Sequence, residues 1–497
     1  MKKTLSVLLG VSVVTSVAAG ISGCMGADGT KTLTWVQIGD KPQDYDTVMA
    51  AVNEIVEPEL GMKLEINYID SAAFAEKAKM KMASGENYDL IFTGYVNDYQ
   101  NAVRMGGLMD ITDKLDNIMM SDGTTVKMSD VVEGYYLDSA KVGGKLYGIP
   151  NAQVISNPAC LMIEEPVAEK SGIDCEGLSK LGRSAENYEG VVSFLDALTE
   201  EMAKIKSSNP ELYTIYPVNP ACSNIYEELA GGVGIRRDGS SDEVVVLNTT
   251  PENIYGIDTI HKWYEEGYIR NDIASNNSVA TTEEQRQYAL YQTTWKPGQD
   301  IYTYNQRGVN PEYIFYENPY VGRTKALLTM ISVGANSKHP EEAVKLIYML
   351  NSNYKNVFNT LCWGIEGVHY KLNDDKTAAE IKGSGYEQVA QNAWKYGNQF
   401  NGYVMEGQPA DVWEQTVKMN DSAKKSPAIG FVPNTDVIAT EIGNIKNIQS
   451  EYKAKASFGT SPREEYWDEY MAKLEAGGME KIRAEIQKQY DEFLASK

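Results

Sequence analysis

The amino-terminal part of the chain alternates short apolar runs with longer segments of helical periodicity. The run TLTWVQIG at residues 32–39 predicts a buried strand followed by a loop. Apolar residues between Val48 and Val56 recur at helical spacing, and KLEINYI at residues 63–69 alternates as a strand does. A second helix that ends at Gly85 and a third strand, YDLIFTG, follow. This order predicts a parallel sheet with helices on both faces.

Polar and aromatic side chains stand where two of these strands end. Trp35 and Gln37 close the first strand, and Tyr95, Asn97 and Asp98 follow the third. In such sheets ligands bind beyond the carboxyl ends of the strands. We therefore expect these five residues at a ligand site, with core packing as the alternative for Trp35.

The chain is too long for one ordinary core. Its 497 residues include several further helical stretches between Leu178 and about Gly298. Single cores stop growing at roughly 250–300 residues, so two or more lobes are expected. In one stretch Trp263 falls on the apolar helical stripe, and Trp413 and Trp467 lie on later amphipathic helices. We expect these three rings in the core.

The amino terminus has the pattern of an export signal. Two lysines precede the uncharged apolar stretch 5–19, which is shorter than the ~20 apolar residues of a membrane span. The letters ISGC that follow resemble a bacterial lipobox, in which the cysteine is lipidated and the chain is cut before it. We predict a lipoprotein signal peptide at residues 1–23, lipidation of Cys24 and a tether at residues 24–31. An ordinary secretory signal with a chance cysteine is the alternative.

Charge and cysteine content narrow the partners and the chemistry. The chain carries 69 Asp and Glu against 46 Lys and Arg, a net charge of −23, which argues against a nucleic-acid partner. The four cysteines other than Cys24 form no Cys-x-x-Cys pair, and the three histidines lie far apart. We therefore predict no metal site and no cofactor, and we expect buried free thiols. A disulfide between two of these four cysteines is the alternative, because exported proteins can form such bonds.

The sequence contains no motif that identifies a catalytic residue. The chain has no G-x-S-x-G, H-E-x-x-H or G-x-x-x-x-G-K-[ST] motif, and Arg237 occupies the third glycine position of a dinucleotide-like stretch, GGVGIRRDG. We predict no catalytic residue and no enzyme activity. A glycosidase that uses two carboxylates stays open, because 69 acids allow many chance pairs.

Several stretches together resemble one protein family. They are GGLMDITDKLD at 106–116, GGKLYGIPNA at 143–152, SVGANSKHPEEAVKLIYMLN at 332–351 and SPAIGFVPNTDVIATEIGNIKNIQSEY at 426–452. With the lipobox they resemble the extracellular solute-binding proteins of family 1, which serve sugar ABC transporters, and within it a Gram-positive lipoprotein subgroup with a distinctive carboxyl-terminal region. In the third stretch Pro340 is expected at a helix start, with two glutamates in the first turn.

The resemblance implies a two-lobed α/β fold of the type II periplasmic-binding-protein kind. Each lobe would be a mainly parallel sheet flanked by helices, with the ligand cleft between the lobes. Residues 32–150 and 325–360 are expected in the first lobe, and residues 151–324 and 361–497 in the second. The resemblance further implies a monomeric, lipid-anchored protein on the outer face of the cytoplasmic membrane. It would capture a carbohydrate, in particular an oligosaccharide, by lobe closure and deliver it to an ABC permease.

Tryptophans in loops are candidates for contact with such a ligand, because aromatic faces cover the apolar surfaces of sugars. Trp295 stands in TWKPGQ, where the following Lys-Pro-Gly argues against a ring buried on a helix. Trp363 and Glu366 stand in the glycine-containing stretch LCWGIEGVHY, and Trp394 stands in the polar stretch QNAWKYGNQFNGY. For Trp295 and Trp363, packing inside the protein is the alternative.

Three other functions stay open on sequence alone. They are an exported carbohydrate-active enzyme, a lipoprotein that binds peptides or other solutes, and a surface adhesion or scaffold protein without a small ligand. Aromatic grooves also bind peptides and amphipathic molecules, so aromatic content does not choose between them.

Overall fold

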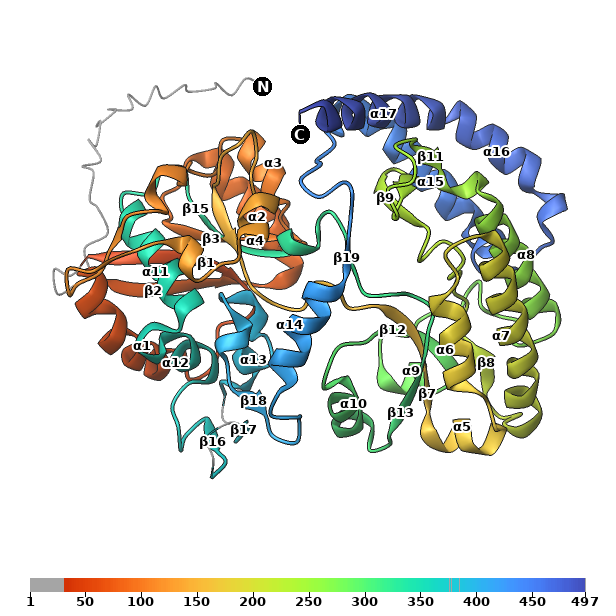
Figure 1. The fold of residues 1–497 in the computed structure, drawn as a ribbon, viewed down its shortest axis with the longest axis horizontal. Helices are drawn as coiled ribbons and strands as arrows, with labels where there is room; N and C mark the ends of the chain where they lie inside the picture. The colour runs from red at the N-terminus through yellow and green to blue at the C-terminus, as the bar shows by residue number, and fades with distance from the viewer. Residues whose placement is uncertain (1–30, 375, 377, 384, 497) are drawn as a thin grey trace, which may run out of the picture.

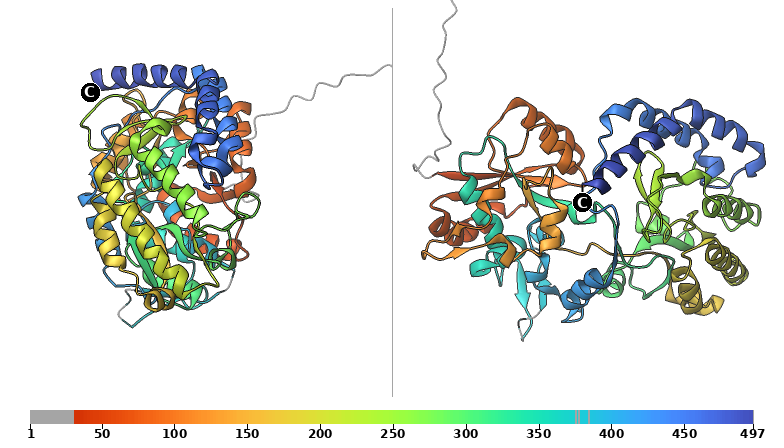
Figure 2. Two further views of the ribbon diagram at one scale, coloured as in Figure 1. Left: turned by 90° about the vertical axis from the view of Figure 1, so that its right-hand side faces the viewer. Right: turned by 45° about the horizontal axis from the view of Figure 1, so that its top comes forward.

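The computed structural model describes residues 31–374, 376, 378–383 and 385–496, so the predicted signal peptide, Cys24 and most of the tether lie outside the described residues. The described residues form two lobes, which stand side by side in Figure 1. Figure 2 shows the carboxyl-terminal helices along one edge of the second lobe.

No helix in the described part of the chain has the length and apolar character needed to cross a membrane.

The first lobe is built on a five-stranded sheet. Its strands are β1 (Thr32–Ile38), β2 (Lys63–Ile69), β3 (Leu90–Gly94), β6 (Gly148–Pro150) and β15 (Thr329–Val333). They lie in the order β2-β1-β3-β15-β6. β1 pairs in parallel with β2 and β3, and β15 is antiparallel to β3 and β6. The three strands predicted from the amino-terminal pattern are thus confirmed, and among the described strands of this sheet β15 runs against the others.

Helices flank this sheet. They are α1 (Tyr45–Leu60), α2 (Ser71–Ser84), α3 (Tyr99–Arg104), α4 (Gly134–Ser139), α11 (Pro340–Ser352) and α12 (Val357–Trp363), and a small hairpin is formed by β4 (Ile118–Met119) and β5 (Thr125–Val126). α1 buries Val48 and Val56, as its spacing predicted. α11 begins at Pro340 with Glu341 and Glu342 in its first turn, so the predicted helix start is confirmed. The missing N–H of proline and the acids both suit that end of a helix.

The second lobe has a four-stranded sheet. Its strands are β7 (Ala159–Glu164), β8 (Tyr213–Ile215), β12 (Tyr288–Thr294) and β13 (Pro311–Phe315), in the order β13-β7-β12-β8. β7 is antiparallel to β13 and β12, whereas β12 is parallel to β8. The flanking helices are α5 (Glu165–Ser171), α6 (Cys175–Arg183), α7 (Tyr188–Ser208), α8 (Pro251–Glu265), α9 (Thr282–Gln285) and α10 (Gln299–Arg307). Trp263 on α8 is fully buried, as predicted, and donates from Nε1 to Thr199 Oγ1 at 2.8 Å.

The carboxyl-terminal helices form a separate apolar cluster on the second lobe. They are α15 (Ala439–Ala456), α16 (Trp467–Ala476) and α17 (Met479–Ala495), and they pack against the antiparallel strands β9 (Tyr226–Ala230), β10 (Val233–Arg236) and β11 (Val245–Val246). Ile445, Ile482 and Tyr490 are buried against Val233 and Ile235 in this cluster. Trp467 packs half-buried at its edge.

The segment that follows α12 packs on the first lobe, not on the second. It holds β16 (Tyr370–Leu372), β17 (Ala378–Ile381), α13 (Glu387–Ala390), β18 (Val404–Met405) and α14 (Val412–Ser422). Leu361, Tyr386 and Tyr396 are buried in the same apolar cluster as Trp35 and Phe92. The expected assignment of residues 361–423 to the second lobe therefore differs from their packing, because an apolar surface of α1 and α12 is covered by this returning segment.

The described cysteines carry free thiols. Cys160, Cys175 and Cys362 are buried and Cys222 is partly buried, and none of the four is paired in the described structure. Burial in apolar surroundings raises the pKa of each thiol. These groups are therefore packing residues with little thiolate at neutral pH.

Candidate functional site

Three segments connect the lobes within the described chain. The first is residues 151–158, the second contains β14 (Tyr320–Val321) and the third contains β19 (Lys424–Lys425). β14 and β19 pair in parallel, with Tyr320 opposite Lys424. The second and third connections are therefore joined as one narrow ribbon.

Glu227 on β9 fixes this ribbon to the second lobe. Its carboxylate accepts hydrogen bonds from the Tyr320 hydroxyl at 2.9 Å and from the backbone N–H of Arg323 at 2.7 Å. It also accepts a short hydrogen bond from the Ser426 hydroxyl. Hydrogen bonds to a charged acceptor are stronger than neutral ones. One side chain therefore holds both paired connections.

Asn420 at the end of α14 holds the first connection. Its Oδ1 accepts from the backbone N–H of Ile155 at 3.1 Å and from the Ser156 hydroxyl at 3.0 Å, and its Nδ2 donates to the Gln153 carbonyl at 2.9 Å. The amide therefore uses both its donor and its acceptor on the chain between the lobes.

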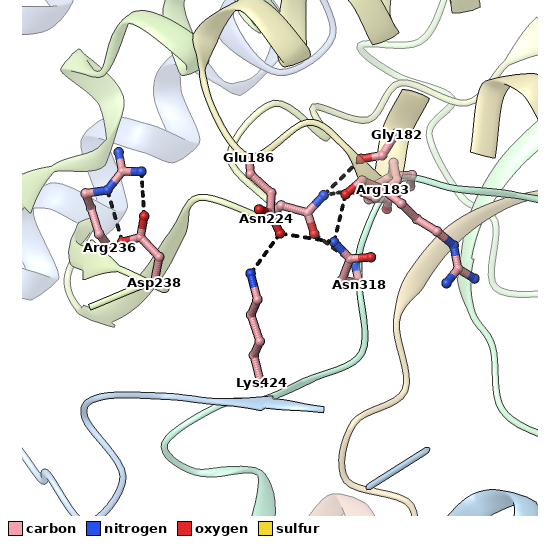
Figure 3. Close-up of polar contacts among 9 residues, drawn as sticks. Gly182, Arg183, Glu186, Asn224, Arg236, Asp238, Asn318 and Lys424 are labelled. Carbon is pink, nitrogen blue, oxygen red and sulfur yellow. Dashed lines mark hydrogen bonds and ion pairs between the residues drawn. The ribbon is translucent and has the colours of Figure 1, made fainter. Parts of the chain in front are cut away.

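A polar network lies where the ribbon meets α6 and α7, as Figure 3 shows. Lys424 Nζ is 3.0 Å from Glu186 Oε1, and Asn318 Nδ2 donates to the Arg183 carbonyl at 2.7 Å. In Figure 3 the guanidinium of Arg183 points away from this network. It stands over the Phe315 ring, 4.3 Å from the ring centroid.

A cavity of about 290 Å³ lies where the lobes meet. The second lobe contributes Lys296 and Tyr302 from the loop after β12 and from α10, and the first lobe contributes the segment that returns after α12. Figure 1 shows α10 and α14 on neighbouring sides of the boundary between the lobes. The lining residues are Lys296, Tyr302, Trp363, Ala390, Gln391, Asn392, Ala393, Trp394, Gln399, Gly402, Tyr403, Met405, Gln408 and Trp413. We call this space the cleft cavity.

The lining of the cleft cavity combines flat rings with planar amides. Trp363, Trp394 and Trp413 line it together with four Asn and Gln side chains. The indole Nε1 of Trp413 donates to the Gly402 carbonyl at 2.8 Å, which fixes its ring. Gln408 spans the boundary, because its Nε2 donates to the Gly298 carbonyl at 3.4 Å. Aromatic faces and amides are the groups that cover and hydrogen-bond the two kinds of surface on a sugar ring.

Trp394 is held at this site through its backbone. Its carbonyl accepts from Asn151 Nδ2 at 3.2 Å and from the Thr329 hydroxyl at 3.3 Å. Its ring lies 6.0 Å from that of Tyr95, which is 51% exposed and follows β3. Partial burial raises the pKa of Tyr95, so its hydroxyl is neutral at physiological pH. Two residues predicted from separate stretches therefore lie side by side.

Trp295 lies beside a different hollow. It lines a more open cavity of about 670 Å³ in the second lobe, together with Arg183, Tyr313 and Phe315. Its ring packs edge-on against Phe315, with centroids 5.7 Å apart. The structure therefore separates Trp295 from Trp363, although the next residue, Lys296, reaches the cleft cavity.

The remaining predicted residues are not gathered in the cleft cavity. Trp35 and Gln37 are fully buried in the first lobe, so they lie in the core and not on a ligand-facing surface. Asp98 is exposed and caps α3 by accepting from the Asn101 N–H at 2.7 Å, and Glu366 is exposed on the loop before β16. Asn97 is partly buried, and its Nδ2 has no hydrogen-bond partner among the described atoms.

Sequence reasoning missed Trp413. It was expected in the core because α14 is amphipathic, but it is only partly buried and lines the cleft cavity. Trp413 lines the cavity, whereas its neighbour Val412 is buried with Ala378 and Val404. Gln408, just before the helix, lies at the contact between the lobes, but nothing in the local sequence marks it as such.

Comparison with known proteins gives matches over nearly the whole chain. A family described as "Domain of unknown function (DUF3502)" matches residues 427–495. The carbohydrate ABC transporter substrate-binding protein of Streptococcus pneumoniae serotype 4 is 27% identical, over 97% of this chain and 97% of that protein.

Solved structures of solute-binding proteins are also similar to this chain. The crystal structure of the N-glycan transport solute binding protein (NgtS) of Streptococcus pneumoniae has a TM-score of 0.77 and 25% identity, and covers 93% of this chain and 99% of that one. An extracellular solute-binding protein of Bifidobacterium longum subsp. infantis has a TM-score of 0.57 at 15% identity, over 94% and 99% of the two chains. The latter likeness concerns the fold alone.

The two α/β lobes with a lined cavity between them have the fold of the type II solute-binding proteins. More narrowly, the chain is similar to NgtS over nearly its whole length, and its residues 427–495 match DUF3502. The resemblance drawn from the sequence is confirmed.

Proposed function

We propose that this protein captures an oligosaccharide in the cleft cavity and delivers it to an ABC permease. The observation that carries the proposal is the cavity between the lobes, where three tryptophans and four side-chain amides stand together. The relatives support it: one is named as a carbohydrate ABC transporter substrate-binding protein, and NgtS has been crystallised with Man5GlcNAc. That structure is 26% identical to this chain, with a TM-score of 0.65.

The mechanism is closure of the lobes around the ligand. Lys296 and Tyr302 stand on one lobe and the three tryptophans on the other. A ligand that touches both sets binds the closed arrangement more tightly than the open one, and this difference in affinity shifts the population. The protein itself makes or breaks no bond in this scheme, and its named relatives are binding proteins.

We further propose that the protein acts at the outer face of the cytoplasmic membrane, held there by lipid on Cys24. The pattern ISGC after an apolar stretch supports this anchor. Acyl chains contribute about 0.8 kcal/mol per buried methylene, so two or more of them hold a folded body at a membrane.

A thermal-shift screen of neutral and acidic oligosaccharides tests the function. A ligand that binds the folded state alone stabilises it by about 2.7 kcal/mol at a concentration 100 times Kd, and this should raise the melting temperature. Mass spectrometry of the released ligand should find its mass unchanged. Cleavage of the glycan would establish an enzyme instead, and a shift with peptides but with no glycan would contradict a carbohydrate ligand.

Replacing Cys24 by serine is expected to abolish attachment of fatty acid to the protein, because serine cannot carry the thioether-linked lipid. Metabolic labelling of the cells with a radioactive fatty acid, followed by immunoprecipitation, measures the change. Cys222→Ser is the matched control and should keep the label. A Cys24→Ser protein that is labelled as strongly as the wild type would contradict the anchor.

A further inference from the structure

The charge of the cleft cavity is opposite to that of the chain. The whole sequence has a net charge of −23. Yet of the described residues that line the cavity, none is aspartate or glutamate, and the charged one is Lys296. Sites for neutral sugars can use carboxylates, which accept hydrogen bonds from hydroxyls. The lining of this cavity lacks that acceptor and offers a cation in its place.

Lys296 has no ion-pair partner among the residues that the structure describes. On α10, Asp300 Oδ1 accepts a hydrogen bond from Trp295 Nε1 at 3.4 Å. Partial burial lowers the pKa of Lys296, and no neighbouring carboxylate contributes to that pKa. Burial of a charged group is unfavourable unless an opposite charge or hydrogen bonds compensate it. No ion pair among the described residues offsets this cost, and an anionic group bound in the cavity would do so.

Other groups around the cavity are donors as well. Trp363 is 4% exposed and lines the cavity, and its indole Nε1 has no hydrogen-bond partner among the described atoms. Lys395 lies beside the lining and is not part of it; its ammonium is 5.0 Å from the centroid of the Trp394 ring, and burial lowers its pKa against the opposing effect of Asp40. An ammonium and an indole N–H donate and cannot accept. Lys296 and the Trp363 indole can therefore be satisfied by a ligand group that is rich in acceptors, beside amides of the lining that both donate and accept.

We propose that the cleft cavity selects an acidic oligosaccharide, in which the carboxylate of a uronic or sialic acid residue pairs with the ammonium of Lys296 while neighbouring sugar rings lie against the tryptophans. This inference rests on the proposed function, since it specifies the ligand of the same cavity. The carboxylate supplies the opposite charge that Lys296 lacks and acceptor oxygens for the unpaired donors.

Matched pairs of glycans test this inference by calorimetry on the intact mature chain. Sialyllactose is compared with lactose, and trigalacturonate with its methyl ester. At low salt the acidic member of at least one pair is expected to bind about tenfold or more tightly than its neutral partner. The preference should shrink as salt screens the charges, although less than for an exposed pair. In Lys296→Met, which keeps the length of the side chain, the preference should disappear, and in Lys296→Arg it should persist.

The controls separate the possible failures. Lys262→Met removes an exposed lysine on α8 and should leave the preference intact. Neutral glycans that bind as tightly as their acidic partners, or a Lys296→Met variant that weakens both members equally, would overturn the inference and leave the proposed function standing. If no glycan of either kind changes the melting temperature of a folded protein, the proposed function fails and the inference fails with it.

Discussion

Replacing Trp35 by alanine is expected to lower the free energy of unfolding by about 3–5 kcal/mol, the range for a buried tryptophan cut back to a methyl group. Trp35 is 0% exposed, and its ring packs edge-on against Tyr396 with centroids 5.6 Å apart. Its removal leaves a void between β1 and the segment that returns after α12, which the close-packed surroundings fill only in part. Unfolding in urea, followed by circular dichroism, measures the loss.

Trp35→Phe is the matched variant. It keeps most of the apolar volume, and the indole Nε1 that it removes has no hydrogen-bond partner among the described atoms. We expect a smaller loss of stability than for alanine. Both variants should bind ligand with unchanged affinity at temperatures where they are folded. A loss of affinity with an unchanged unfolding midpoint would instead show that Trp35 contacts the ligand.

Replacing Trp394 by alanine is expected to weaken oligosaccharide binding by about 1–3 kcal/mol, roughly 5- to 150-fold in Kd, the range for loss of a stacking ring. Trp394 lines the cleft cavity, and its backbone is fixed by hydrogen bonds that the variant keeps. The effect should therefore fall on affinity more than on stability. Calorimetry with the oligosaccharide that gives the largest thermal shift measures it.

Trp467→Ala makes the same chemical change on α16, away from the cleft cavity, where the ring stacks under Arg463. It should leave Kd within about twofold of the wild type. Equal losses of affinity in the two variants would show that the change in Trp394→Ala is a general effect of destabilisation. Unchanged affinity in Trp394→Ala would remove this ring from the binding surface.

The local pattern was enough to predict the amino-terminal half of the first lobe. β1 and β3 were predicted as short apolar runs and β2 from its alternation of apolar and polar residues, and such signals depend on neighbours in sequence. The start of α11 was predicted because Pro340 and the two glutamates that follow it act within a single turn. Both predictions rest on interactions between residues that are close in sequence.

The packing partners of later segments could not be predicted in this way. The pattern of an amphipathic helix shows that one face is apolar, but not whether that face meets a core or a cavity. Trp263 on α8 is buried in a core, whereas Trp413 on α14 lines the cleft cavity. Similarly, the apolar residues of 361–423 indicate that this segment packs in a core, but not in which lobe. Their place on the first lobe depends on contacts far apart in sequence, such as Gln37 with Lys395. For Trp295 and Trp394, only the structure shows which hollow each ring faces.

The paired connections β14 and β19 limit how the lobes can move. A single strand between two bodies lets them swing, tilt and spin independently, whereas two strands hydrogen-bonded side by side resist bending across their width. Glu227 clamps this ribbon at one end, and Asn420 holds the first connection. We therefore expect the open protein to explore few mutual orientations, so that a ligand that brings the lobes together would remove little rotational freedom. More of each contact made in the cavity would then remain as affinity, and the hinge itself would be a determinant of binding strength.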